Sequence, residues 1–167
     1  MSTEDATPEP TSTGPTAPDP TRPQVYQIFI RATPEAIWEA ITRPEFTTRY
    51  FHGARVETTG EVGTPFRYLS PDGTAVWGDE TVLEAEPGRR LVVGWRSLYD
   101  PRFAAEPASR VTWEIDPQDG GYCLLTVVHD RLESSPATAA NVQGPGWMMV
   151  LSGLKTLLET GEPLVAR

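Results

Sequence analysis

Apolar residues recur at helical spacing in the last part of the chain. They follow an i, i+3, i+4, i+7 pattern, and they are Trp147, Val150, Leu151, Leu154, Leu157 and Leu158. This spacing predicts an amphipathic helix over 146–160 with one wide apolar face. Gly161 fits a helix C-cap, and Pro163 prevents the helix from continuing. The apolar face must be buried, and a curved sheet covering it would leave room for a ligand cavity.

Before this helix, the apolar residues alternate with polar ones or form short runs, which is typical of strands. The first strand is expected at 25–30, and others at 54–57, 65–69, 75–84, 90–95, 109–115 and 122–130, with a turn at 116–120 between the last two. Between the first two strands, Thr33-Pro34 and Arg43-Pro44 each mark the start of a short helix. This order predicts an α+β domain with its helices on one side of an antiparallel sheet.

Alternation along the strands predicts which side chains face the long helix. The candidates for lining a cavity on that side are Phe66, Tyr68, Trp77, Trp95, Tyr99, Phe103, Trp113, His129, Trp147 and Leu151. Aromatic walls with a few polar groups are typical of small-molecule pockets. The alternative is that the aromatic residues are ordinary core and that His129 is a hydrogen-bonded interior histidine.

Two segments fall outside the regular pattern. Residues 97–108 contain Pro101 and Pro107, and they predict either the rim or lid of a pocket or a plain connector. Residues 1–23 are mostly Pro, Thr, Ser, Ala and acidic residues, which predicts a disordered acidic tail, with a docking tail or linker as the alternative. A single domain is therefore expected over 24–167.

Composition narrows the classes of partner. The formal net charge is −9, which argues against nucleic acid or an anionic membrane as a partner. No apolar stretch approaches the ~20 residues of a membrane span, so no integral membrane association is expected. Cys123 is the only cysteine, so it cannot form an intramolecular disulfide. A free thiol fits the reducing cytoplasm.

Motifs for catalysis, cofactors and metals are missing. The chain has no G-x-S-x-G, P-loop or H-E-x-x-H sequence. His52, His129 and Cys123 do not have recognisable metal-ligand spacing, so no metal site and no cofactor are expected. Asp79 and Glu80 are neighbours in a strand and point to opposite faces. Asp79 shares its face with Trp77, so one of the two is a candidate for burial, although solvent exposure suits both.

Four stretches resemble a known family. They are residues 28–38, the turn at 84–91, the strand at 109–115 and the helix at 146–161. In order and spacing they resemble the SRPBCC, or START-like, superfamily, in the branch named for the C-terminal domain of the Hsp90 ATPase activator Aha1. The resemblance implies a helix-grip (START-like, Bet v 1-like) fold, in which a seven-stranded antiparallel sheet wraps around a long C-terminal helix and encloses a cavity. It implies binding of small hydrophobic molecules in many members and cyclisation chemistry in a few.

Three functions follow as hypotheses. The first is binding of a small hydrophobic or aromatic molecule between sheet and helix, without catalysis. The second is a protein-interaction role with a chaperone or a regulator, which needs an exposed apolar patch or an acidic docking face. The third is an aromatase/cyclase-like or hydrolase-like enzyme that uses His129 with Asp79, Glu80 or a tyrosine as acid and base. No residue is assigned a catalytic role from the sequence.

Overall fold

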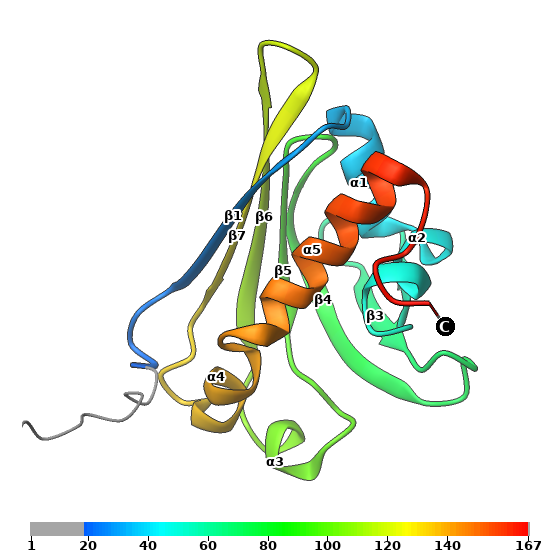
Figure 1. Cartoon of the computed structure of the whole chain (residues 1–167). Coiled ribbons are helices and arrows are strands. Elements are labelled where there is room, and N and C mark those ends of the chain that lie inside the picture. The colour runs from blue at the N-terminus through cyan, green and yellow to red at the C-terminus, as the bar shows by residue number, and fades with distance from the viewer. Residues whose placement is uncertain (1–18, 167) are drawn as a thin grey trace, which may run out of the picture.

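A single antiparallel sheet is the central element of the computed structural model, which describes residues 19–166. Its strands are β1 (Gln24–Ile30), β2 (Arg55–Thr58), β3 (Pro65–Leu69), β4 (Val76–Glu86), β5 (Arg90–Trp95), β6 (Ser109–Gln118) and β7 (Tyr122–Asp130). The helices are α1 (Pro34–Thr42), α2 (Pro44–Tyr50), α3 (Pro101–Ala104), α4 (Pro136–Val142) and α5 (Pro145–Thr160). The strand order is β1-β7-β6-β5-β4-β3-β2 (Figure 1). The predicted α+β fold with a seven-stranded antiparallel sheet and a long final helix is confirmed.

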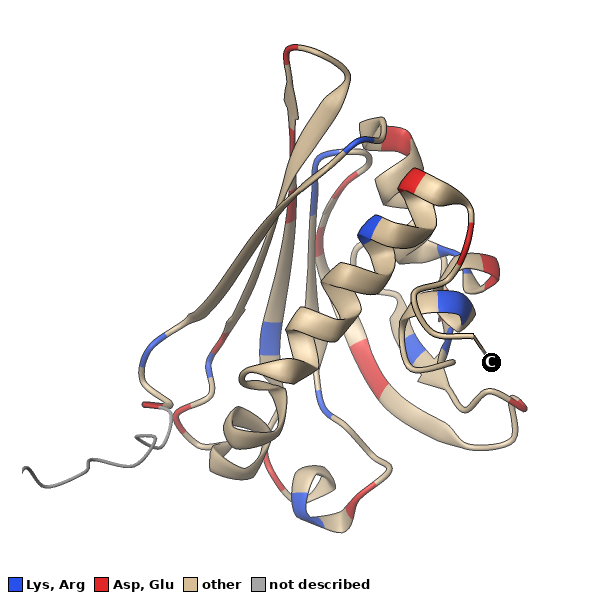
Figure 2. Cartoon of the chain, viewed as in Figure 1, with Lys and Arg blue, Asp and Glu red and all other residues tan. Residues whose placement is uncertain are grey.

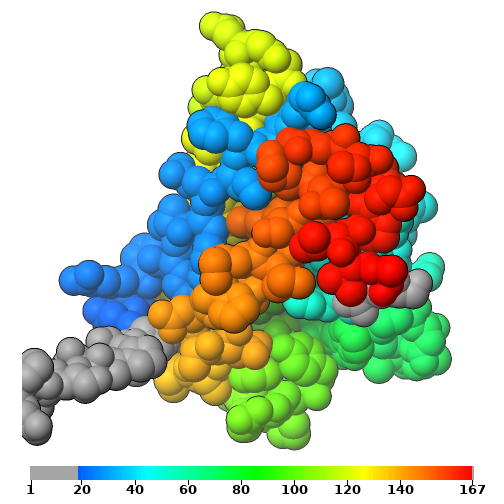
Figure 3. Space-filling view, in the orientation of Figure 1, coloured from blue at the N-terminus to red at the C-terminus, as the bar shows by residue number. Residues whose placement is uncertain are grey.

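The sheet curves around α5, which lies across its concave side (Figure 1). In the space-filling view α5 and the residues after it lie on one face of the molecule, beside the N-terminal strand (Figure 3). The inward faces of the strands follow the predicted alternation, since Val111, Trp113 and Ile115 are buried while Glu114 is exposed. The core therefore lies between the concave side of the sheet and α5, α1 and α2.

Local capping explains where the helices begin and end. The Thr33 side chain accepts a hydrogen bond from the backbone N–H of Ala36 at 3.2 Å, and Pro34 occupies the first position of α1. At the end of α5, Gly161 adopts the left-handed conformation with φ 78°, and its N–H donates to the Leu157 carbonyl. Both caps were predicted from the sequence.

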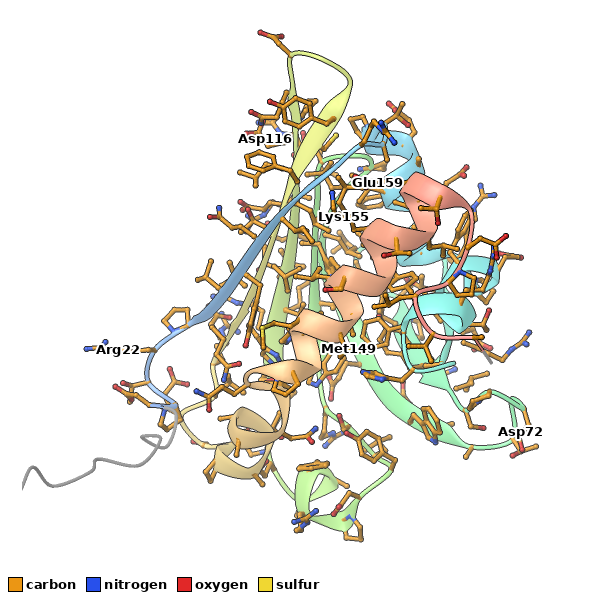
Figure 4. The ribbon with its side chains drawn as sticks, in the orientation of Figure 1. Arg22, Asp72, Asp116, Met149, Lys155 and Glu159 are labelled. Atoms are coloured by element: carbon orange, nitrogen blue, oxygen red, sulfur yellow. The ribbon has the colours of Figure 1, made fainter. Side chains whose placement is uncertain are left out.

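Charged side chains fasten α5 to the sheet at its C-terminal half. Its charged residues, Lys155 and Glu159, lie there, and the rest of the helix is uncharged (Figure 2). The Lys155 ammonium donates to the Phe29 carbonyl at 2.8 Å, and Glu159 accepts from the Arg31 N–H at 2.8 Å (Figure 4). Gly153 lets α2 approach closely, because an added Cβ would come within 3.2 Å of the Tyr50 Cβ. The N-terminal half of α5 packs mainly through apolar side chains, with one hydrogen bond from the Trp147 indole to His129 of β7.

Several element boundaries differ from the prediction. The strand β6 continues through Asp116 and Pro117, which we expected to form a turn. Pro117 is tolerated because β5 pairs with β6 only as far as Glu114, so its missing N–H faces no neighbouring strand. Two short helices, α3 and α4, were not predicted, and α5 begins at Pro145, one residue before the predicted start.

The N-terminal tail is only partly described. The prediction of disorder for residues 1–23 concerns mostly residues 1–18, which lie outside the described part of the chain. Residues just before β1 form a turn, in which Thr21 donates to Asp19. Gln24, the expected start of the domain, is the first residue of β1. Among the described helices, none has the length and apolar character needed to cross a membrane.

Candidate functional site

A cavity of about 420 Å³ lies between the sheet and the N-terminal half of α5. Ligand-binding cavities typically span roughly 300–1,000 Å³, so its size suits a small molecule. Its lining comes from the strands β3, β4 and β5, the turn between α2 and β2, the segment after β5, and helices α4 and α5. The lining residues are Phe51, His52, Ala54, Phe66, Tyr68, Trp77, Gly78, Asp79, Glu80, Gly94, Trp95, Arg96, Ser97, Tyr99, Asn141, Val142, Gly146, Trp147 and Val150.

Four aromatic rings packed against one another form a continuous apolar wall of the cavity. Phe51 stacks on Tyr68 with ring centroids 4.7 Å apart, and Tyr68 meets Trp95 edge-on at 5.8 Å. Trp95 and Trp147 are 5.6 Å apart, and Trp147 meets Phe51 at 6.2 Å. Ring contacts at these spacings hold the wall in one arrangement. The wall offers a ligand a rigid aromatic surface.

Charged side chains gather on the β4–β5 side of the cavity. Glu80 forms an ion pair with Arg96 at 3.3 Å, and Asp79 accepts a hydrogen bond from Arg67 at 2.9 Å. Glu80 is the more buried carboxylate, with a side chain 20% exposed against 43% for Asp79. The sequence left open which of the two would be buried, and neither is fully buried, although Glu80 lies deeper. Gly94 makes room, because an added Cβ there would come within 3.0 Å of Glu80. Burial raises the pKa of Glu80, and Arg96 opposes this effect.

Behind the aromatic wall, His129 anchors Trp147 to the sheet. The indole N–H of Trp147 can only donate, and it lies 3.1 Å from His129 Nδ1, so Nδ1 is the unprotonated nitrogen. Nε2 then carries the proton and donates to the Ser109 hydroxyl at 2.7 Å. That hydroxyl in turn donates to the Trp95 carbonyl at 3.1 Å. Burial lowers the pKa of His129 from 6.5 to about 3, so the ring is neutral in the folded protein near neutral pH.

The hydrogen bonds of His129 bear on two hypotheses from the sequence: that it is an interior, hydrogen-bonded histidine, and that it pairs with a carboxylate as acid and base. Both ring nitrogens are engaged, by Trp147 and Ser109, and no carboxylate side chain among the described residues bonds to them. The ring is fully buried and does not line the cavity. His129 therefore has the position expected of a hydrogen-bonded interior histidine. The acid–base pairing of His129 with Asp79 or Glu80 that an enzyme would need is not formed.

The segment 97–108 forms part of the cavity rim. Ser97 and Tyr99 line the cavity, and Tyr99 contacts both Trp77 and Phe103 through ring edges. The Tyr99 hydroxyl accepts a hydrogen bond from the Asn141 side chain of α4 at 3.0 Å, in an exposed position. The prediction that this segment forms a rim therefore holds for its first residues, and the Tyr99–Asn141 bond links them to α4.

Glu106 holds the two rim helices together. Its carboxylate accepts hydrogen bonds from the backbone N–H groups of Ala137 and Thr138 and from the Thr138 hydroxyl, at 2.7 to 2.9 Å. It therefore caps the N-terminus of α4 from about thirty residues away, while the local cap residue Ser135 donates to the Pro107 carbonyl instead. The helices α3 and α4 lie next to each other at the lower end of Figure 1.

Replacing Glu106 with Ala is expected to loosen α4. The change removes three hydrogen bonds to groups that have no other cap, which costs about 1–2 kcal/mol. Amide hydrogen exchange should then quicken in α4 while β5 and β6 keep their protection. Glu133→Ala, a change at an exposed residue just before α4, is the control and should leave exchange unchanged. Equal exchange in the two variants would contradict this role of Glu106.

The predicted lining residues divide into two groups. Phe66, Tyr68, Trp77, Trp95, Tyr99 and Trp147 line the cavity. Phe103, Trp113, His129 and Leu151 are buried but are not among its lining residues. Trp113 is covered by Trp147, whose ring lies 5.5 Å away. Whether the lining residues bind a ligand stays a prediction.

The sequence reasoning missed several lining residues. Val150 belongs to the apolar face of the predicted helix and could have been named from its position one turn after Trp147. Phe51 and Asn141 carry no comparable signal, since they come from an irregular turn and from an unpredicted helix. Within residues 19–166, no group of three or more His, Cys, Asp and Glu side chains could hold a metal ion.

Solved structures with the same fold come from several bacteria. A Mesorhizobium loti protein is 26% identical with a TM-score of 0.63, and the match covers 83% of this chain and 97% of that one. DynU16, from the dynemicin biosynthetic locus, is 25% identical with a TM-score of 0.68, covering 87% of this chain and 49% of DynU16. An Aha1 dimer from Colwellia psychrerythraea is 17% identical with a TM-score of 0.65, covering 84% and 98%. No curated protein matches the chain.

The family model gives a match over most of the domain. The model described as activator of Hsp90 ATPase homolog 1-like protein matches residues 31–159, from the end of β1 to the last turn of α5. This range contains the strands β2 to β7, the aromatic wall and the rim of the cavity. It agrees with the resemblance seen in the sequence and with the helix-grip architecture. The chain belongs to the activator of Hsp90 ATPase homolog 1-like family.

Proposed function

We propose that this protein binds a small hydrophobic or aromatic molecule in the cavity between the sheet and α5. The observation that carries the proposal is the cavity itself, about 420 Å³ and walled by Phe51, Tyr68, Trp95 and Trp147. A protein interior is normally packed without voids of this size. Burying apolar ligand surface contributes about 25 cal/mol per Å², so a bicyclic ligand gains several kcal/mol from the wall alone.

Native mass spectrometry of protein purified from its own host tests the proposal. A bound molecule should appear as added mass that is lost on denaturation, and its mass would identify its chemical class. A clean mass, together with no thermal shift across a library of apolar compounds, would contradict the proposal. The protein-interaction hypothesis would then come first, and a pull-down would be the next experiment.

A bulkier side chain in the cavity should weaken ligand binding. Val150 is buried and lines the cavity from α5, so Val150→Phe places a ring in the space that the ligand needs. We expect the affinity for an apolar aromatic probe to fall at least about tenfold, which corresponds to 1.4 kcal/mol. Isothermal titration with the same probe measures the effect.

The matched control lies on the same helix. Met148 is 51% exposed and does not line the cavity, so Met148→Phe adds a similar ring on the outer side of α5. This variant should bind the probe as the unmodified protein does. Equal binding by both variants would show that the probe binds elsewhere.

A further inference from the structure

Two uncharged hydrogen-bond donors in the cavity wall have no partner within the described residues. The indole Nε1 of Trp95 is buried and makes no hydrogen bond within the described residues. Tyr68 as a whole is 7% exposed, and its hydroxyl, which is less completely buried than the Trp95 Nε1, makes no hydrogen bond within residues 19–166. Consistent with this, burial alone raises the pKa of Tyr68. By contrast, the N–H of Trp147 is bonded to His129, and the Tyr99 hydroxyl is bonded to Asn141.

Unpaired buried donors call for an explanation. Leaving such a group without a partner costs about 1–3 kcal/mol, and most buried polar groups in proteins are paired. Here the two donors belong to neighbouring residues, since the rings of Tyr68 and Trp95 are 5.8 Å apart and both line the cavity. A ligand that brings an acceptor atom to this part of the wall would pair them.

The charges around the cavity select against an anionic acceptor. Asp79 and Glu80 both line the cavity, and Arg96 is the only Lys or Arg among the lining residues. Arg96 forms an ion pair with Glu80, although its buried Nε makes no hydrogen bond to any described residue, so the lining carboxylates outnumber the lining guanidinium two to one. A ligand anion would also lie close to Glu80, which costs free energy in a partly buried site.

We propose that the cavity is built for a neutral, planar molecule with a hydrogen-bond-accepting oxygen, such as an aromatic ketone, which pairs with the Trp95 N–H and the Tyr68 hydroxyl. This inference rests on the proposed function and names the ligand class for the same cavity. The aromatic wall holds the planar body of the ligand. The unpaired donors fix its orientation, and the carboxylates exclude fatty acids and other anions.

Three probes of nearly equal shape separate the contributions of apolar burial, hydrogen bonding and charge to binding. They are 2-acetylnaphthalene, which carries a neutral carbonyl oxygen, 2-ethylnaphthalene, which lacks it, and 2-naphthoate, which is an anion. The ethyl compound is the more apolar, so burial alone would make it bind better than the ketone. We expect the ketone to bind about fivefold more tightly than the ethyl compound, as one net hydrogen bond of about 1 kcal/mol provides, and naphthoate to bind most weakly.

A variant and a spectroscopic signal assign the effect to the two donors. Tyr68→Phe should weaken the ketone about fivefold and leave the ethyl compound within twofold, while Tyr122→Phe, outside the cavity lining, should change neither. In proton–nitrogen NMR spectra, the Trp95 indole N–H signal should move downfield with the ketone and not with the ethyl compound. A thermal melt of each variant confirms that it is folded.

The possible failures are distinguishable. If the ethyl compound binds as tightly as the ketone and Tyr68→Phe changes neither affinity, the donors do not select the ligand, although cavity binding stands. If naphthoate binds most tightly, the assignment of a neutral ligand is overturned. If none of the three probes binds, the proposed function fails, and this inference fails with it.

Discussion

Trp147→Ala should lower the free energy of unfolding by about 4 kcal/mol, the loss typical of a buried tryptophan replaced by alanine. The side chain is 2% exposed and contacts the rings of Phe51, Trp95, Trp113 and His129. The variant also leaves His129 Nδ1 without its donor. Urea unfolding followed by circular dichroism measures the change.

The neighbouring residue supplies the control. Met148→Ala lies on the same turn of α5 but is largely exposed, so its cost should stay within about 0.5 kcal/mol. If both alanine variants lose the same stability, α5 is generally intolerant of substitution and the anchoring role of Trp147 is wrong. The larger loss at Trp147 alone supports a cavity wall held by packing and by the bond to His129.

Acidification should destabilise the protein well before its carboxylates titrate. The pKa of His129 is 6.5 when unfolded and is lowered to about 3 by burial in the folded state. Between these values the unfolded chain binds a proton that the folded protein does not, so stability rises with pH and falls on acidification. The slope is about 1.4 kcal/mol per pH unit, and the loss at pH 5 relative to neutral pH is therefore about 2 kcal/mol.

Two histidine variants isolate this effect. His129→Asn removes the titrating ring but keeps an acceptor for Trp147, so its stability should be lower throughout and nearly constant between pH 7 and pH 5. His52→Gln changes the other histidine, and the steep dependence should remain because His129 is still present. Denaturant unfolding at pH 7, 6 and 5 gives both slopes. An unchanged slope in His129→Asn would show that another group causes the acid loss.

Elements with local signals could be predicted from the sequence. The amphipathic face of α5, the cap at Gly161 and the alternation in β6 depend on residues that are close together in the sequence, and all are confirmed. The helix α4 was missed because it has only seven residues, too few for a clear period, and because its capping group, Glu106, is distant in the sequence. The Asp116–Pro117 pair was misread as a turn because its tolerance depends on where β5 ends.

The division between cavity and core could not be predicted. Trp113 and Trp147 both face the interior, and alternation assigns them the same role. The cavity is lined by Trp147 and not by Trp113. The reason is that His129 and the surrounding rings hold the Trp147 indole over Trp113. Such placement depends on contacts between distant segments, which periodicity does not reveal. The same applies to Glu80, whose position depends on the absence of a side chain at Gly94.

The position of α5 at the end of the domain has a consequence for protein synthesis. The concave side of the sheet is covered by the last helix in chain order, which supplies Trp147, Val150, Leu151, Leu154 and Leu157 to the core. A nascent chain that has emerged from the ribosome only as far as β7 cannot yet bury that face. Exposed apolar surface promotes aggregation during folding. The nascent chain is therefore prone to aggregate until α5 has emerged and covered the concave side of the sheet.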